Sequence, residues 1–594
     1  MKQKQIKVPA ITPVSNKGPR NAFDLSQRHL FTAPVGALLP VQSTELMPGD
    51  HVSMKITDFM RVMPCNSAAF IDCKGSYETF FVPFSQLWKP WNQFITSMQD
   101  YNSTLLANKN LLSGSVVPPV SLPSVDLHSV ITSIWNIPSS ITDDFGYPLS
   151  FGFSRLSDLL GYGKFVKSDF SHLWDSGALW DSVTSPFPSS LMVNLFRFLA
   201  YQKIYQDVYR NTQYERFDVG SFNIDDFNNG LNVISDNDRL RRMFSLRYRN
   251  YGLDLLSNIR PSVLVDAYSA DTVTALSPNI YQPYNDVRTD PVEQSGWSDA
   301  GVSGFKVDDV NLHHEDSRSD LSVRSLRAAF AYQNLLDTMG RAPKTYKDQM
   351  KAIFGVDVPL GLEGKVQYVG GVDSPFQFGD VTNTAISAAD SSASNPYSSG
   401  LGGSVVKGVG SGSGYMEFDA PVHGVLMTIY SVIPQNQYDS TRLDPFNQKS
   451  SRADYFLPQY DHLGMQPLYQ SAITMRNFST LADGKTKAND SLTRALGWQP
   501  RYSEYKTAID INHGQFTDDG PLRFFTSDRS RGMVSDSNWL SDLRLRDLKI
   551  NPNIFDSVFK VSYNGKESTD PFYGSVQFNI TKVSNMDRQS LPNV

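Results

Sequence analysis

The fold is decided by a short stretch near the N-terminus, which reads MPGDHVSMKIT at residues 47–57. Its Pro48-Gly49-Asp50 segment is a turn signal, because proline fixes φ at the second turn position and glycine accepts positive φ at the next. The following VSMKIT, residues 52–57, alternates apolar with polar side chains. That period of two predicts a β-strand with one buried face.

Similar strand signals recur downstream and at the far end of the chain. Phe80 and Phe81 are adjacent, so they point to opposite faces of one strand, and we expect that strand to be covered by the core and by a neighbouring chain or insertion. The apolar run VLMTIYSVI at 425–433 has the length of a buried strand. Alternation at 559–563 and at 576–581, with Asn564-Gly565 as a turn, predicts two strands that pair near the C-terminus.

The middle of the chain carries the helical signals. An apolar stripe runs along 191–210, and another lies within 322–339. Residues 100–190 are interrupted by prolines and are expected to form an irregular excursion, and the Ser/Gly-rich stretch 388–415 is expected to be a loop. Strands at both ends with helices between them predict a β-sandwich that closes late in the chain.

Composition limits the class of protein. The 594 residues are 40% hydrophobic, 12% aromatic and only 19% charged, which is typical of a protein that buries much of its surface internally or against partners. The formal net charge of -6 means that any nucleic-acid binding must be local. Cys65 and Cys73 are too few for a disulfide scaffold, and we expect both to be buried thiols. No signal-peptide or membrane-spanning pattern is found, so we expect a soluble compartment and no membrane insertion.

The first 22 residues form a basic arm without acidic residues. Its three prolines make a packed core there improbable. Flexible cations neutralise phosphates without a fixed geometry, so we expect the arm to bind nucleic acid through Lys2, Lys4, Lys7, Lys17 and Arg20. A merely solubilising tail is the alternative.

Candidate catalytic features fail on their chemistry. Gly161-Tyr162-Gly163-Lys164 lacks the first glycine and the final Ser or Thr of a phosphate-binding loop. The cluster at 313–316 (HHED) holds possible metal ligands, but adjacent residues rarely reach one ion, and a solvated loop is the better interpretation. His423 precedes an apolar strand without a nearby nucleophile, which favours a structural histidine. We therefore expect no catalytic, metal or cofactor site.

Nine short motifs occur in an order that resembles one family. They are FDLS (23–26), LLP (38–40), MPGD (47–50), YETFFVPF (77–84), RSLRAAF (324–330), IFGV (353–356), YVGG (368–371), VHG (422–424) and YSEY (502–505). The series resembles the major capsid proteins of the Microviridae, the small icosahedral single-stranded DNA phages, and particularly their gokushovirus-like branch. The resemblance covers roughly Phe23 to Phe555 and weakens at about 100–190 and 262–320.

The resemblance implies a fold and a function. It implies a mainly β protein, an eight-stranded antiparallel jelly roll with large loop and helical insertions. After the arm at 1–22, a single capsid domain would fill 23–594, with insertions near 100–190, 191–260 (helical), 262–320 and 388–415. The function implied is a T=1 icosahedral virion shell that encloses circular single-stranded DNA, assembled in the cytoplasm of a bacterial host.

The resemblance also implies partners. These are further copies of the chain, the genome, a small basic DNA-binding protein, scaffolding or pilot proteins, and a host receptor. Gokushovirus-like relatives carry a variable insertion in an interval comparable to 262–320, where three copies form a protrusion. Many carboxylates lie there, and Tyr281, Tyr284 and Trp297 supply contact area for a host surface.

Two other classes of protein remain possible on residue patterns alone. A β-sandwich carbohydrate-binding or carbohydrate-active protein would use aromatic-rich loops, but a convincing carboxylate pair is missing. A non-viral surface-layer protein would be expected to carry a secretion signal.

Overall fold

The computed structural model describes most of the β framework and parts of the insertions. The described residues are 20–63, 72–96, 122–135, 149–163, 191–212, 215–226, 239, 242–256, 259–260, 331, 334–335, 338–339, 346–356, 364–382, 404–440, 442–461, 464–473, 475, 495–517, 520–522, 525–527, 549–552, 554–555, 562–563, 566–567 and 570–586.

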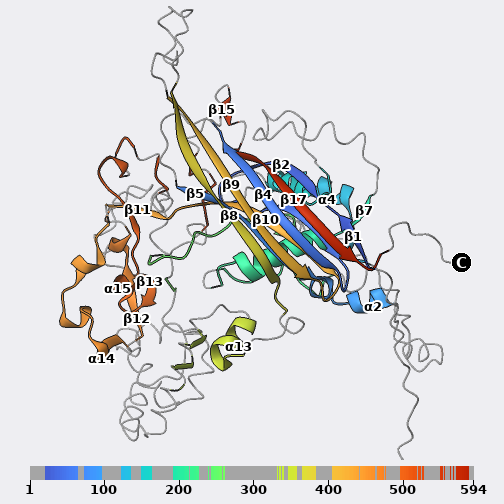
Figure 1. The fold of residues 1–594 in the computed structure, drawn as a ribbon. Coiled ribbons are helices and arrows are strands. Elements are labelled where there is room, and N and C mark those ends of the chain that lie inside the picture. Colours follow the sequence, from blue (N-terminus) through green and yellow to red (C-terminus); the bar gives the residue numbers. More distant parts are fainter. Residues whose placement is uncertain are drawn as a thin grey trace, which may run out of the picture.

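One curled antiparallel sheet dominates the described part of the chain (Figure 1). Its nine strands are hydrogen-bonded in the order β1-β17-β4-β9-β8-β5-β10-β3, and β2 also pairs with β17. The strands are β1 (Asn21–Asp24), β2 (Gln27–Ala33), β3 (Leu39–Leu46), β4 (His51–Val62), β5 (Cys73–Pro83), β8 (Gln367–Thr382), β9 (Ser404–Asp419), β10 (Gly424–Pro434) and β17 (Phe572–Ser584).

The strand order is that of a jelly roll. Because β1 and β2 both pair with β17, they occupy one strand position, which leaves eight positions along the chain. One half of the sheet then reads first-eighth-third-sixth (β1/β2-β17-β4-β9), and the other reads second-seventh-fourth-fifth (β3-β10-β5-β8). These two four-stranded halves face each other across a core, so the predicted jelly roll is confirmed.

The two halves are joined by the long β8–β9 hairpin. Strand β8 pairs with β5 through residues 367–375 and with β9 through residues 376–382. Strand β9 then continues against β4. The Ser/Gly-rich stretch expected as a loop over 388–415 is therefore strand from Ser404 onward, and that part of the prediction is wrong.

The stretch at 47–57 folds as predicted. Gly49 adopts φ +84°, and the Asp50 carboxylate accepts the Met47 N–H at 2.9 Å, which closes the turn. That carboxylate also lies 2.9 Å from the ammonium of Lys582 in β17, and both side chains are buried. In β4 the even-numbered residues from 52 to 62 face the sandwich core and the odd-numbered ones face outward.

Strands β5 and β10 are buried on both faces. Phe81 belongs to the core between the sheet halves, whereas Phe80 belongs to a second core on the opposite side. Each buried phenylalanine contributes about 1.5–3 kcal/mol. An insertion of the chain itself covers this second side, which confirms the expectation of a strand covered on both faces.

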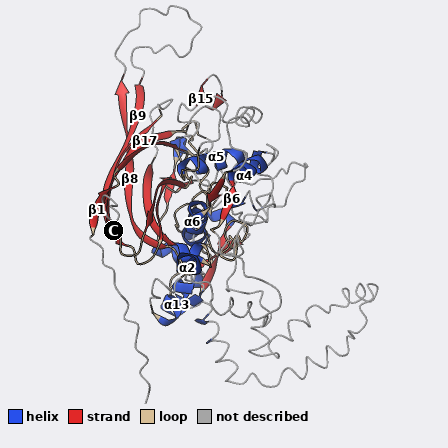
Figure 2. Cartoon of the chain, turned by 90° about the vertical axis from the view of Figure 1, so that its right-hand side faces the viewer, coloured by secondary structure: helices blue, strands red, loops and turns tan. Residues whose placement is uncertain are grey.

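Helices form that cover, as Figure 2 shows beside the curved sheet. They are α1 (Phe84–Leu87), α2 (Trp91–Thr96), α4 (Leu127–Trp135), α5 (Leu149–Leu159) and α6 (Phe196–Ile204), which continues as the π-helical turn η2 (Tyr205–Tyr209). A short β6–β7 pair joins Ser124–Asp126, just before α4, to Met192–Asn194, just before α6.

The helical predictions need two corrections. The stripe at 191–210 is helical only from Phe196, because Met192–Asn194 pairs as a strand, and α6 is buried on nearly all sides instead of along one stripe. The interval 100–190, expected to be irregular, contains α4 and α5. Most of 322–339 lies outside the described residues, and α13 (Tyr346–Phe354) follows it.

The C-terminal pairing also differs from the prediction. A small hairpin does form, β15 (Ser562–Tyr563) with β16 (Lys566–Glu567). Strand β17, however, pairs with β1, β2 and β4, more than 500 residues away. Residues 559–561 lie outside the described residues. Hydrophobic alternation identifies a strand but not its partner.

The connection between β10 and β17 forms a small module of its own, seen beside the sheet in Figure 1. Its elements are β11 (Gln437–Asp439) paired with β14 (Asp510–Asn512), β12 (Met465–Tyr469) paired with β13 (Ala495–Pro500), α14 (Pro458–Asp461), α15 (Ser503–Lys506), and the 3-10 turns η4 (Pro445–Gln448), η5 (Arg452–Asp454), η6 (Gln470–Ala472) and η8 (Gly514–Phe516).

Candidate interaction surfaces

The sheet half β1/β2-β17-β4-β9 presents one face away from the core. Its outward side chains are exposed or half-buried, and Leu30 and Tyr415 are 74% and 62% exposed. We call this the outer sheet face. It is formed by Arg28, Leu30, Thr32, Ser53, Lys55, Thr57, Phe59, Arg61, Ser411, Ser413, Tyr415, Glu417, Tyr573, Ser575, Gln577, Asn579 and Thr581.

Charged side chains are spread along the outer sheet face. Arg61 lies near the C-terminal end of β4, and its guanidinium is 5.0 Å from the centre of the Phe59 ring. Arg28 is level with Thr57, and Lys55 lies beside Tyr415, two residues from the Ser53–Glu417 pair. Cations interleaved with aromatic rings can contact phosphates and stack on unpaired bases.

The predicted nucleic-acid-binding arm meets this sheet at its edge. Arg20 is the first described residue, and its guanidinium donates to the Gly49 carbonyl at 2.5 Å. Strand β1 starts at Asn21, so the last two residues of the predicted arm belong to the sheet. The other arm cations, Lys2, Lys4, Lys7 and Lys17, lie outside the described residues.

The segment predicted to face the host also lies outside the described residues, with Tyr281, Tyr284 and Trp297 in it. The chain approaches this segment at Arg260. There the Arg260 N–H donates to the Trp498 carbonyl at 2.7 Å, and the Trp498 N–H donates back at 2.8 Å. The segment therefore starts beside β13 of the β10–β17 module.

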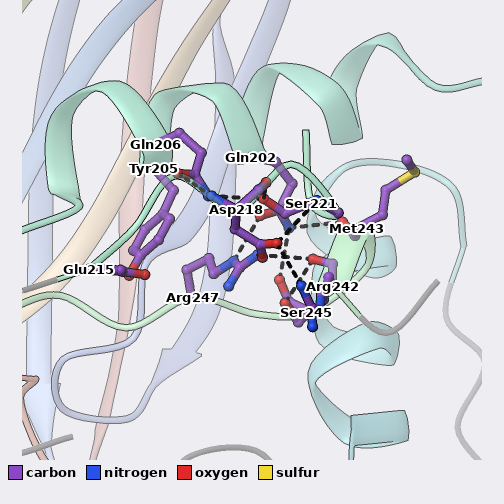
Figure 3. Close-up of polar contacts among 11 residues, drawn as sticks. Gln202, Tyr205, Gln206, Glu215, Asp218, Ser221, Arg242, Met243, Ser245 and Arg247 are labelled. Atoms are coloured by element: carbon purple, nitrogen blue, oxygen red, sulfur yellow. Dashed lines mark hydrogen bonds and ion pairs between the residues drawn. The ribbon is translucent and has the colours of Figure 1, made fainter. Parts of the chain in front are cut away.

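A polar network fixes α6 within the insertion (Figure 3). The Gln202 amide donates to the carbonyls of Met243 and Ser245 at 2.8 and 3.0 Å and accepts from Arg247 at 2.8 Å. Arg247 in turn lies 3.3 Å from Asp218. Because these groups are largely buried, each bond that is lost would leave an unpaired polar atom, which makes the insertion a rigid cover.

A second contact ties the insertion to the sheet. Glu78 of β5 accepts two hydrogen bonds from Arg249, at 2.8 and 3.1 Å, and one from the Tyr209 hydroxyl. Burial and then the Glu78 charge raise the pKa of Tyr209 well above its ordinary value, so this phenol stays a donor. Two-pronged Arg–carboxylate pairing fixes direction as well as distance.

Features that resembled catalytic motifs have structural roles. Gly161 and Gly163 follow helix α5 instead of a strand, and the Tyr162 ring stacks on Phe198 at 4.6 Å between ring centres, which rules out a phosphate-binding loop. The His423 ring packs edge-on against Trp91 at 5.6 Å, and its carbonyl accepts the Phe84 N–H. Burial lowers the pKa of His423.

Within the described ranges no three His, Cys, Asp or Glu side chains gather as a metal site, and the 313–316 cluster lies outside them. Cys73 is buried and in no disulfide, as predicted, while Cys65 is not among the described residues. The helices that the structure describes include none with the length and hydropathy needed to cross a bilayer.

An aromatic surface in the β10–β17 module was not predicted from the sequence. Six Phe and Tyr side chains between residues 446 and 505 are more than a third exposed. The density of aromatic residues around 446–469, followed by YSEY at 502–505, was the available signal.

A jelly roll with one sheet half covered by its own helices, an exposed second half and large insertions defines a viral capsid type of subunit. The family described as "Capsid protein (F protein)" matches residues 13–147 and 169–593. The chain belongs to this family, the F-type capsid proteins of the Microviridae, single-stranded DNA phages. It is a structural protein of the virion and not an enzyme, so the carbohydrate-active and surface-layer alternatives do not hold.

Two relatives give the same assignment. The chain is 23% identical over 519 residues to the capsid protein VP1 of Chlamydia phage 1, which covers 82% of each chain. It is 22% identical over 524 residues to the capsid protein VP1 of Bdellovibrio phage phiMH2K, covering 84% of this chain and 82% of that relative.

Proposed function

We propose that this chain is the repeating subunit of a T=1 icosahedral shell around a circular single-stranded DNA genome, assembled in the cytoplasm of a bacterial host. The observation that carries the proposal is the jelly roll, whose outer sheet face and insertions remain exposed in a single copy. Tyr346, Phe354 and Tyr415 are each more than 60% exposed. Exposed aromatic surface of this kind marks contacts with other chains.

The experiment is electron cryo-microscopy of particles formed by the full-length chain together with the phage's other structural proteins. We expect closed shells in which each subunit buries more than about 1,600 Å² against its neighbours, because several neighbours share the contact. Tyr415 should be buried in the shell. The same is expected of Trp174, Trp180 and the Trp135 side chain, which lie outside the described set. A chain that remains monomeric under these conditions, with Tyr415 exposed, would contradict the proposal.

The genome contact is assigned to the basic arm and to the cations Arg28, Lys55 and Arg61 of the outer sheet face. Arg20 leads from the arm into β1, and Arg28 lies on the neighbouring strand β2. The net charge of -6 restricts the attraction to such local regions. A small basic DNA-binding protein would share this work, and scaffolding or pilot proteins would guide assembly.

Host attachment is assigned to the segment at 262–320, in which Tyr281, Tyr284 and Trp297 would form contacts. Replacement of this segment by a short Gly/Ser linker is expected to spare the jelly roll and the shell but to lower adsorption to host cells. Adsorption assays on purified particles of equal DNA content measure this. Normal adsorption would rule out the receptor role, and failed assembly would indicate a structural role at the threefold axis.

A further inference from the structure

An aromatic patch covers one side of the β10–β17 module. Its six rings, each between 38% and 57% exposed, belong to Phe446, Tyr455, Phe456, Tyr460, Tyr469 and Tyr505. They come from η4, the η5–α14 connection, β12 and α15. Tyrosine is enriched among the residues that dominate protein–protein binding, because its ring gives large contact area and its hydroxyl a hydrogen bond.

A buried cation holds part of the patch in place. The Lys449 ammonium lies 3.9 Å from the centre of the Tyr505 ring, 4.6 Å from that of Phe446 and 5.3 Å from that of Tyr455. Its side chain is only 4% exposed, and Glu504 lies 3.4 Å away. The inner faces of these rings therefore bind the cation while other parts of them face solvent, so the rings are fixed before any partner arrives.

A strained residue stabilises the same arrangement. Tyr502 adopts φ +60° and ψ +30°. No other non-glycine residue that the structure describes has a positive φ. Its hydroxyl donates to the carbonyls of Ala453 and Tyr455 at 3.1 and 3.0 Å, and its N–H donates to Gln466 at 2.9 Å. A left-handed backbone conformation costs a residue other than glycine about 1–3 kcal/mol, and residues strained in this way cluster at functional sites.

A cavity of about 240 Å³ opens between η4, η5, β12 and β13, bordered by Tyr469 of the patch. Gln499 and Arg501 are among the residues that line it. The cavity therefore offers polar residues beside the aromatic rings of the patch.

Charge on the module argues for a protein partner. Three of the module's described cations lie near carboxylates: Lys506 lies 3.3 Å from Asp461, and Arg442 lies 3.6 Å from Asp444, in addition to the Lys449–Glu504 pair. DNA binds most strongly to cations that are not already paired, so a surface whose cations lie beside carboxylates has little affinity for it. The partner is therefore expected to present apolar and polar groups without high net charge.

We infer that the aromatic patch, with its cavity, is a contact surface for a neighbouring copy of this chain. The inference rests on the proposed shell and names one of its interfaces. A shell of identical copies supplies such a neighbour at high local concentration. The patch also lies in the module from which the 262–320 segment departs, since Arg260 is bonded to Trp498 in β13.

The test replaces Tyr460 and Tyr469, which lie outside the Lys449 cage, by serine. The matched control is the Tyr460→Phe, Tyr469→Phe variant, which keeps both rings. We expect Tyr460→Ser, Tyr469→Ser to raise the chain concentration needed for half-maximal assembly at least about tenfold, whereas the Phe control stays within about threefold of the wild type. Sedimentation of assembled and unassembled chain measures this, with circular dichroism to compare the folds.

A second measurement uses the unaltered chain. Hydroxyl-radical labelling of Tyr455 and Tyr469 is expected to fall at least about threefold when wild-type subunits assemble. Unchanged labelling in assembled shells, or serine variants that assemble at the wild-type concentration, would overturn the inference while leaving the shell proposal intact. Failure of the wild type itself to form shells would instead contradict the proposed function.

Discussion

At the scale of single residues, Asp58 is a buried carboxylate in the sandwich core that is incompletely hydrogen-bonded. It is 2% exposed, one of its carboxylate oxygens accepts the Gly412 N–H, and the other has no hydrogen-bond partner. The hydroxyls of Tyr77 and Tyr430, also fully buried, lack partners as well. Burial raises the pKa of Asp58 and outweighs the nearby Ser374 hydroxyl and backbone N–H groups, including that of Gly412, which lower it. The charged form of Asp58 therefore disfavours folding.

This predicts a specific dependence of stability on pH. The pKa of Asp58 is raised in the folded state, so the cost of the buried charge is fully present above that folded pKa and is relieved as pH falls through it toward the unfolded value of 3.8. Asp58→Asn is expected to raise the thermal midpoint at pH 8, and the gain should shrink as pH falls toward 4.

Asp373→Asn is the matched control, because the folded structure lowers the pKa of Asp373 instead of raising it. Burial raises the pKa of Asp373, but hydrogen bonds from Lys74 and Ser76 outweigh it, so its pKa is lowered overall. Its carboxylate therefore favours folding at neutral pH, and removal of the charge should lower the midpoint there. Thermal unfolding of the three chains from pH 4 to 8 measures both effects. A gain for Asp58→Asn that is independent of pH would contradict the electrostatic explanation.

At the scale of elements, β9 shows why a Ser/Gly-rich sequence can be a strand. Glycines alternate at 408, 410, 412 and 414, so all of them lie on the side of β9 that faces β8 side chains. A Cβ added at Gly410 would lie 3.0 Å from the Phe376 ring. The strand keeps its glycines because large side chains from β8 fill the space that other residues would need.

Gly414→Ala tests this explanation. A Cβ at this position would lie 2.2 Å from a methyl carbon of Val372, so β8 and β9 must separate or Val372 must shift. We expect a loss of about 1–3 kcal/mol of unfolding free energy. Ser413→Ala, on the exposed outer face of the same strand, should change it by less than about 0.5 kcal/mol. Chemical denaturation measures both, and equal effects would show that strand propensity and not packing against β8 is responsible.

At the scale of the whole molecule, charge placement predicts how the shell holds its genome. Replacement of Lys2, Lys4, Lys7, Lys17 and Arg20 by glutamine is expected to lower DNA retention in particles and to reduce its salt dependence, because fewer counterions are released. Arg28→Gln with Lys55→Gln, on the outer sheet face, should add to the loss. The jelly roll should stay folded in every variant.

Glu417→Gln serves as the control, since it removes one negative charge from the same face. DNA content per particle, measured by absorbance across a salt series, distinguishes the variants. Unchanged retention in the arm variant at every ionic strength would assign the work to another protein of the particle.

The sequence alone determined the features that depend on local periodicity. Alternation placed β4 and the inward residues of β17, because a side-chain period of two is set by the strand's own geometry, and a continuous apolar run placed β10. The turn at Gly49 was also local, since it needs only a residue that accepts positive φ. The order of short motifs identified the capsid family, which the match over 13–147 and 169–593 confirms.

Only the tertiary structure decided which strands pair and which surfaces remain exposed. β17 joins β1, β2 and β4 from the other end of the chain, and the glycines of β9 became strand because Val372 and Phe376 of β8 pack across them. The cage around Lys449 assembles residues from η4, the η5–α14 connection and α15. Such arrangements depend on contacts between segments distant in sequence, whose free energy is gained only when the whole sandwich closes, so no local window of sequence contains them.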